Sequence, residues 1–217
     1  KTGKLALRPD QSHGGTSKSE GFYTWSEADI ATFEDRYPIG SRARLALALL
    51  LYTCQRRSDV VRMGRQHVRN GALAVRQQKT GTSLEIPLHP DLQSVLEASQ
   101  AEHLTFLVTH EGRPFTPAGF TNWFRDTVRA AGLPDGCSPH GLRKAACRRL
   151  AEAGCTPHEI MSISGHKSLK EVTRYTAAAE QKRLAVRAMS TVVGMEREQP
   201  LANAAKKLAT STSNPLT

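Results

Sequence analysis

A tyrosine that follows a Gly-His pair within a short helical pattern is the first feature of this sequence that could do chemistry. The stretch SGHKSLKEVTRYT (164–176) contains Gly165, His166 and Tyr175. An isolated tyrosine is a weak nucleophile, because its phenol titrates near pH ~10. It reacts only where neighbouring groups take its proton or stabilise the charge that develops. A single tyrosine is more often part of a core, so the rest of the chain must decide between these two interpretations.

Other residues with acid-base or anion-binding chemistry occur in three short motifs. The motif PHGLR carries a histidine and an arginine three positions apart, which puts both on one face of a helix. The motif TCQRRSD carries an arginine and then an acid, and QQKTG carries a lysine in a predicted hairpin turn. Each motif alone is weak, since basic helices, helical ion pairs and solvated turn lysines are common. The residues concerned are Arg56, Asp59, Lys79, His140 and Arg143.

The charge balance of the chain indicates a polyanionic partner. The 217 residues include 30 Lys and Arg against 20 Asp and Glu, which gives a net charge of +10. Basic side chains that contact a phosphate backbone release its condensed counterions, so a strongly basic protein of this size favours nucleic acid as its ligand. The sequence has neither a secretory signal nor an apolar run long enough to span a bilayer, and we therefore expect a cytoplasmic protein.

Two Cys-x-x-His pairs raise the alternative of a zinc site. They lie in CSPH (137–140) and CTPH (155–158), and two thiolates with two imidazoles can hold zinc. Both pairs, however, contain a hydroxyl residue followed by proline, which is how many helices begin. We favour the helix-start interpretation and expect reduced cysteines that act as small hydrophobic residues.

Helices and one hairpin must position these groups. A helix in 23–37 is predicted to be capped by Ser26, and 39–53 is apolar nearly all round, which is typical of a central helix. Between 71 and 88 the pattern changes to that of two β strands around the Lys79 turn. Further helices are predicted in 89–100, 114–132, 138–154, 156–165 and 168–176, which leaves Tyr175 on or just beyond the last turn of a short helix.

These elements predict an α+β fold, mostly helical with a small antiparallel hairpin, over residues 21–180. Residues 1–20 are polar and rich in Gly and Ser, as linkers are. Residues 181–198 form a further helical pattern, and 200–217 are small and polar and are expected to be disordered. The tail helix carries one apolar stripe, made of Leu184, Ala188, Val192 and Met195.

Order, spacing and structural context together resemble the catalytic domain of tyrosine recombinases, the integrases of phages and mobile elements. The resemblance runs from about Tyr23 to Ala179. The family's arginine box is matched by TCQRRSD (53–59), its hairpin lysine by Lys79, and its His-x-x-Arg, Gly-His and nucleophile motifs by 140–143, 165–166 and Tyr175. Cys54 stands where the family usually has glycine, and the sequence assigns no consequence to that difference.

The resemblance implies a site-specific recombinase that cleaves and rejoins DNA through a covalent 3′-phosphotyrosyl intermediate, without metal, cofactor or ATP. Two arginine forks would bind the non-bridging phosphate oxygens and favour the phenolate form of Tyr175. His140 would accept the tyrosine proton or hold the phosphate, and His166 would donate to a phosphate oxygen. Lys79, on a mobile hairpin, would protonate the leaving oxygen. The implied catalytic residues are Arg56, Lys79, His140, Arg143, His166 and Tyr175, with Asp59 orienting the neighbouring basic groups.

The resemblance also implies partners and leaves alternatives open. Family members usually carry a helical core-binding domain before the catalytic one, so 1–20 is expected to be the remnant of a linker to it. Double-stranded DNA and other subunits, in a tetramer on DNA, are the expected partners, with no membrane and no small-molecule substrate. A Xer-type resolvase of chromosome dimers, a type IB topoisomerase and a catalytically decayed DNA-binding module remain as alternatives. Whether the tail packs on its own domain or on a neighbour stays open.

Overall fold

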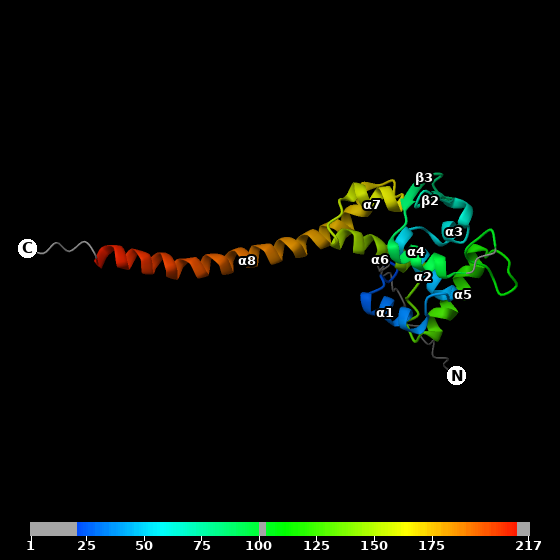
Figure 1. Cartoon of the computed structure of the whole chain (residues 1–217), viewed down its shortest axis with the longest axis horizontal. Helices are drawn as coiled ribbons and strands as arrows, with labels where there is room; N and C mark the ends of the chain where they lie inside the picture. The colour runs from blue at the N-terminus through cyan, green and yellow to red at the C-terminus, as the bar shows by residue number, and fades with distance from the viewer. Residues whose placement is uncertain (1–20, 100–102, 212–217) are drawn as a thin grey trace, which may run out of the picture.

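The computed structural model describes residues 21–99 and 103–211, with side chains up to residue 192. The predicted linker, 1–20, lies outside these residues. A helical body carries a small sheet beside one end, and one long helix, α8 (Leu169–Ser211), leaves the body and projects far from it (Figure 1). The expectation of a mostly helical fold with a small antiparallel sheet agrees with this arrangement.

The central helix of the body is α2 (Arg42–Thr53), as its all-round apolar sequence predicts. Leu47, Leu49 and Leu50 are fully buried in it. α2 packs against α6 (Pro139–Glu152) on one side and against α4 (Pro90–Ala98) and the short α3 (Arg57–Val60) on others. Burial of apolar area of this kind contributes about 25 cal/mol per Å², so α2 is the element around which the others are fixed.

Hydroxyl caps begin four helices where the sequence predicts them. The Ser26 hydroxyl caps α1 (Glu27–Arg36), Thr116 caps α5 (Pro117–Ala130), Ser138 caps α6 and Thr156 caps α7 (Pro157–Ser164). The helix-start interpretation of the CSPH and CTPH motifs is therefore confirmed. Within residues 21–99 and 103–211, no three His, Cys, Asp or Glu side chains are grouped so that they could hold a metal ion.

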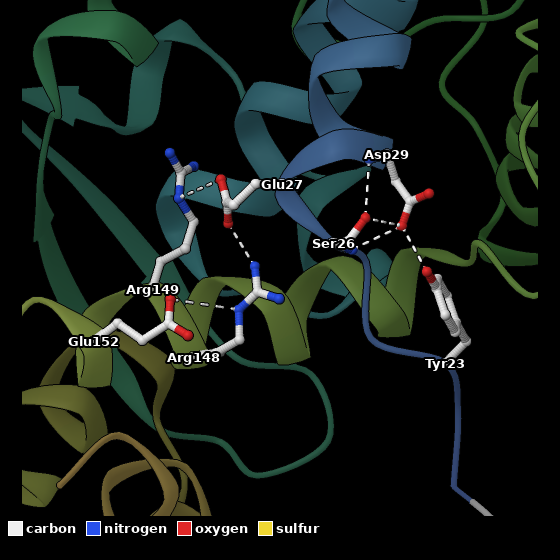
Figure 2. Close-up of polar contacts among 7 residues, drawn as sticks. All are labelled: Tyr23, Ser26, Glu27, Asp29, Arg148, Arg149 and Glu152. Atoms are coloured by element: carbon white, nitrogen blue, oxygen red, sulfur yellow. Dashed lines mark hydrogen bonds and ion pairs between the residues drawn. The ribbon is translucent and has the colours of Figure 1, made fainter. Parts of the chain in front are cut away.

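The N-terminal segment and α1 are tied to α6, the helix that carries His140 and Arg143. Figure 2 shows Glu27 of α1 facing the guanidinium groups of Arg148 and Arg149, at 2.5 and 3.6 Å. Trp25 Nε1 donates to the carbonyl of Ser138 at 3.0 Å, directly before α6 begins. These contacts hold both ends of α6, and therefore its two predicted site residues, relative to the core.

The sheet has three antiparallel strands, one more than the predicted hairpin. β1 (Val68–Arg69) pairs with β2 (Ala72–Arg76), and β2 pairs with β3 (Ser83–Pro87). Asn70 and Gly71 join the first two strands, both at positive φ, which is the turn that an Asn-Gly pair favours. The 3-10 helix η1 (Arg65–His67) leads into β1. The Asn-Gly pair could have revealed this extra strand in the sequence.

The helix α8 corrects the prediction of two separate C-terminal helices. It is continuous for 43 residues and also runs through 200–211, where disorder was expected. Residues 177–181, AAAEQ, are strong helix formers and contain no breaker, so nothing ends the helix after Tyr175. α8 packs against α6 and α7 at its start, but its residues 181–192 are all exposed. Neither α8 nor any other described helix is both long and apolar enough to cross a membrane.

Candidate active site

Arg143 is the most deeply buried of the predicted site residues. It lies in the first half of α6, with 3 % of its surface exposed. Its Nη1 donates to the carbonyl of Cys54, and its Nη2 donates to the carbonyl of Ser164 at 3.0 Å. Cys54 ends α2 in the left-handed conformation at φ +54°, which explains why glycine suits this position. Backbone carbonyls from two separate segments therefore fix the plane of the guanidinium group.

His166 lies against Arg143. Gly165 ends α7 at φ +66° and turns the chain so that the imidazole faces α6. Nη2 of Arg143 lies 3.1 Å from Nε2 of His166, and the Ser164 hydroxyl lies 2.7 Å from Nδ1. Burial, followed by the charges of Arg143 and Arg56, lowers the pKa of His166 to about 4. The ring is therefore neutral at pH 7.

Nη2 of Arg143 lies nearer to Nε2 of His166 than to Nδ1, at 3.1 against 3.5 Å, and the nearer contact indicates the tautomer. A guanidinium group has only donors, so Nε2 accepts from Arg143 and the ring proton lies on Nδ1, which donates to the Ser164 hydroxyl. The predicted donation from His166 to a phosphate oxygen therefore requires a rearrangement of these contacts when DNA binds.

Arg56 lies at the start of α3 and is half-buried. Its Nη1 donates to Oε1 of Gln77 at 3.4 Å. Its charge contributes to the lowered pKa values of Arg143 and His166. The structure thus brings these two arginines and a neutral imidazole into one electrostatic neighbourhood, although they come from three separate sequence motifs.

His140 lies beside the same cluster but more exposed. Its ring packs on Phe22 with centroids 4.6 Å apart. Burial lowers its pKa most, and the charges of Arg143, Lys144, Arg56 and Arg57 lower it further. The imidazole is therefore neutral at pH 7 and able to accept a proton.

Lys79 is exposed in the turn between β2 and β3. Among the described residues, its ammonium group has no hydrogen-bond or ion-pair partner. The turn itself is held on both sides of Lys79: the Gln78 N–H donates to Oδ1 of Asp59 at 2.8 Å, and Lys167 Nζ donates to the carbonyl of Thr80 at 3.0 Å. The structure therefore fixes the base of the turn and leaves the lysine side chain free to reach outward.

Asp59 does not make the contacts that the sequence predicts. It is buried in α3, and its Oδ1 accepts from the backbone of Gln78 rather than from a basic side chain. Its Oδ2 has no hydrogen-bond partner among the described residues. Its negative charge still favours the charged form of Arg143. Asp59 therefore holds the Lys79 turn and acts on the arginine only through space.

Tyr175 lies in the second turn of α8, half-buried against the core. Burial raises its pKa to about 12, with the Cys147 thiol as the next cause, and the opposing effect of Arg143 is smaller. Arg143 favours the phenolate, as predicted, but in the DNA-free protein desolvation of the charged form outweighs the arginine. Its phenol is protonated at pH 7, and its hydroxyl makes no hydrogen bond within the described part of the chain.

A cavity of about 750 Å³ lies beside Tyr175, between α6 and α8. Basic side chains lie along it, and Glu27 of α1 and Glu152 of α6 also line it. Figure 2 shows Arg148 held between these two glutamates, at 2.5 and 3.7 Å. The cavity places open space and positive charge next to the predicted nucleophile. Its basic residues are Arg148, Arg174, Lys182 and Arg183.

Two buried glutamines, Gln55 and Gln77, connect the predicted site residues, and neither was predicted to belong to the site. Gln77 contacts Arg56, Gln55, Thr80 and the carbonyl of Ser164. Its place two positions before Lys79 gives no signal of this role, because glutamine is common in exposed strand ends.

Comparisons with known proteins agree with the resemblance seen in the sequence. The model of the phage integrase family matches residues 27–182. The chain is 31 % identical over 147 residues to a tyrosine recombinase XerC of Rhodospirillum centenum, covering 64 % of this chain and 43 % of that protein. It is 30 % identical over 160 residues to the integrase of Escherichia phage HK022, covering 67 % of this chain and 44 % of that protein. The chain thus spans less than half the length of both relatives.

A solved structure supports the same fold. A lambda integrase tetramer bound to a Holliday junction matches with a TM-score of 0.58 at 26 % identity, covering 70 % of this chain and 49 % of that one.

Proposed function

Because the chain belongs to the phage integrase family, we propose that it is the catalytic part of a site-specific DNA recombinase that works through a 3′-phosphotyrosyl intermediate. The observation that carries this proposal is the cluster of Arg56, Arg143, His140 and His166 beside the helix that bears Tyr175. Because the substrate is DNA, we assign the reaction to the cytoplasm.

The chemistry follows from the charges of this cluster. The Tyr175 oxygen attacks the phosphorus, and the bond from phosphorus to the 5′-oxygen breaks. The two guanidinium groups stabilise the negative charge on the non-bridging oxygens. The tyrosine proton leaves the phenol, for which the neutral His140 is an available acceptor, and the 5′-oxygen takes a proton from Lys79. The reverse attack by a 5′-hydroxyl restores the phosphodiester, so no ATP is consumed.

In this proposal, binding of a phosphodiester changes the pKa of His166. In the free protein, burial and then the charges of Arg143 and Arg56 hold its pKa low. A phosphate anion between these charges offsets the repulsion and raises the pKa, so the ring becomes able to donate to a phosphate oxygen. The imidazole then leaves Nη2 of Arg143, and the Nη2 hydrogen that faced it donates to the phosphate, while both carbonyl contacts are kept.

Covalent trapping on DNA tests the proposal. The chain is incubated with a library of nicked duplexes of randomised sequence. Cleavage near the nick releases a short fragment that carries the 5′-hydroxyl, and without this fragment the strand cannot be rejoined. We expect DNA that stays attached to the protein after denaturation, joined through a tyrosine that mass spectrometry identifies. Retention of DNA without any covalent product would instead indicate the decayed DNA-binding module. Relaxation of a supercoiled plasmid without any preferred site would indicate the topoisomerase.

The Xer-type resolvase is the second candidate, since the match to XerC is as strong as the match to the phage integrase. The two differ in outcome rather than in chemistry. The trapped sequence is placed twice on one circular DNA in one assay and once on each of two DNA molecules in another. Recombination on the single circle would indicate a resolvase, and joining of the two molecules would indicate an integrase.

Lys79 supplies a prediction that depends on the leaving group. Lys79→Ala should cleave normal DNA at least about tenfold more slowly, since the leaving oxygen then lacks its acid. On DNA with a 5′-bridging phosphorothiolate, the sulfur leaves without a proton, and the variant should cleave at nearly the wild-type rate. Single-turnover rates on the two substrates provide the measurement. Equal defects on both would mean that Lys79 positions the phosphate or has no chemical role.

The exposed tail bears on assembly. The solved lambda integrase complex is a tetramer bound to a Holliday junction. We propose that this protein also acts as a tetramer on DNA, and that its subunits exchange C-terminal segments. Leu184 and Val192 of the predicted stripe are 52 % and 48 % exposed, while the side chain of Met195 lies outside the described residues. An apolar stripe without cover on its own domain favours docking on a neighbour.

Truncation after Ala179 tests this proposal for the tail. Single-site cleavage should persist in the truncated protein, and strand exchange between two duplexes should fail. The melting temperature should change little, because every residue from 181 to 192 is exposed. A large fall in melting temperature would mean that the tail packs on its own domain in solution, contrary to the proposed exchange.

A further inference from the structure

We propose that Gln77 is a positioning residue that couples the turn carrying Lys79 to Arg56 and to the segment before His166. This role rests on the recombinase function proposed above. Gln77 follows β2 and is almost fully buried, with 1 % of its surface exposed. It touches none of the atoms that would react, so its effect must pass through its neighbours.

The side-chain amide of Gln77 uses its full hydrogen-bonding capacity. Its Oε1 accepts from the Thr80 hydroxyl at 2.6 Å and from Nη1 of Arg56 at 3.4 Å. Its Nε2 donates to Oε1 of Gln55 at 2.7 Å and to the carbonyl of Ser164 at 2.8 Å. A primary amide offers two acceptor lone pairs and two N–H groups, so no capacity remains. One buried side chain therefore joins four separate points around the site.

The chemistry of the partners fixes the orientation of this amide. Arg56 can only donate and a carbonyl can only accept, so the amide oxygen must face the arginine and the amide nitrogen must face Ser164. Gln55 cannot reverse its own amide to compensate. Its Nε2 already donates to the carbonyls of Thr53 and Ile163, at 2.9 and 2.7 Å. Glutamine is therefore specified at position 77, and an isosteric carboxylate would face two acceptors.

Gly165 provides the space for this arrangement. A Cβ atom at position 165 would lie 2.4 Å from Nε2 of Gln77, closer than any real contact of this kind. The glycine also ends α7 at a positive φ. The Gly-His motif thus serves two purposes. Its glycine leaves room for the Gln77 amide to pack against the backbone, and its histidine lies in the arginine cluster.

The link to Lys79 passes through the turn. Besides the Thr80 hydroxyl bond, the backbone of Gln77 closes the turn with two further bonds, to Thr82 and from Gly81, both 2.9 Å. Lys79 lies inside this closed loop. The carbonyl of Ser164 accepts from Gln77 and from Arg143 at once, so the turn and the buried arginine share one acceptor. Loss of the amide should therefore move the lysine relative to the phosphate-binding arginines.

The test compares Gln77→Leu with Gln78→Leu. Gln78 is the same residue type one position away, but its side chain is exposed, so it is a matched control. Single-turnover cleavage is measured on the trapped sequence, with a normal and a 5′-bridging phosphorothiolate link. We expect Gln77→Leu to lose about 10- to 100-fold on normal DNA, as a displaced catalytic group does, and to recover most of this loss on the phosphorothiolate. Adding Lys79→Ala should cause little further loss.

A second measurement does not need cleavage. Hydrogen exchange in the DNA-free protein should rise in Gln77→Leu at residues 77–82 and 164–167, with little change in α2 and α5 and none in Gln78→Leu. If this pattern holds but the wild-type protein never attaches to DNA, the coupling stands and the proposed function fails. Unchanged exchange at 77–82 overturns the coupling whatever the cleavage rates are.

Two further outcomes complete the test. Equal loss on both substrates, with the fold intact, would mean that Gln77 does not act through Lys79. If Gln77→Leu does not fold, Thr80→Val decides, because it removes only the 2.6 Å bond and keeps the side-chain shape. Thr80→Val should show the same rescue by the phosphorothiolate and the same rise in exchange at 77–82, and the absence of both would overturn the proposal.

Discussion

Replacing Tyr175 by phenylalanine is expected to abolish covalent attachment to DNA completely and to leave folding and DNA binding unchanged. Only the hydroxyl is lost, and the ring keeps its packing against the core beside α6. The hydroxyl has no hydrogen-bond partner among the described residues, so its removal leaves no partner unsatisfied. Trapped adducts on a denaturing gel, melting temperature and DNA retention are the three measurements.

Tyr52→Phe is the matched control for this experiment. Tyr52 is also half-buried with a pKa raised to about 12 by burial, but its hydroxyl donates to Asp91, on the α4 side of the body. This variant should form adducts at the wild-type rate. Recovery of phosphotyrosyl-linked DNA from Tyr175→Phe would show that another residue is the nucleophile.

The second large effect is expected from Arg56→Lys. A lysine keeps the positive charge but cannot reproduce a planar fork that binds two phosphate oxygens. We expect cleavage to fall about 10²- to 10³-fold, the loss found when one preorganised donor to a transition-state oxyanion is removed. The melting temperature should change little, because the one hydrogen bond lost in the free protein, to Gln77, is long at 3.4 Å.

Arg143→Lys should lose at least as much activity and also destabilise the protein. Its guanidinium holds the carbonyls of Cys54 and Ser164 in the interior, and an ammonium group cannot satisfy both in the same geometry. Arg57→Lys is the control, since Arg57 adjoins Arg56 in sequence and is exposed. Wild-type cleavage should be equally fast with and without EDTA, because guanidinium groups supply the positive charge. Loss of cleavage in EDTA, restored by Mg²⁺ or Zn²⁺, would contradict this mechanism.

The parts of the fold that the sequence predicted correctly depend on neighbours within a few positions. Ser26, Thr116, Ser138 and Thr156 cap helices because each hydroxyl meets an N–H three residues later in its own chain segment. The central place of α2 follows from an apolar surface on every side, which only a surrounded helix can bury.

The predictions of the fold were wrong in two places. In one, the sequence contains no signal for the end of a helix, and in the other, the pairing of a short strand was missed. No residue between 176 and 181 breaks a helix, so α8 continues where a stop was predicted. The strand β1 has only two residues and becomes visible through its pairing with β2.

The sequence by itself determined the set of chemical groups and the family, because order and spacing of Arg56, Lys79, His140, Arg143, His166 and Tyr175 are properties of the chain alone. Only the tertiary structure determined the protonation of those groups and the contacts that position them. Burial, which depends on every neighbour in space, raises the Tyr175 pKa to about 12 and lowers that of His166 to about 4.

The connections between the motifs were likewise decided only in three dimensions. Gln77 bonds to a carbonyl 87 positions away, and Arg143 bonds to one 89 positions away. Hydrogen bonds act over about 3 Å in space whatever the separation along the chain. A linear pattern therefore identifies which residues can react, whereas the folded structure determines their protonation and their mutual alignment.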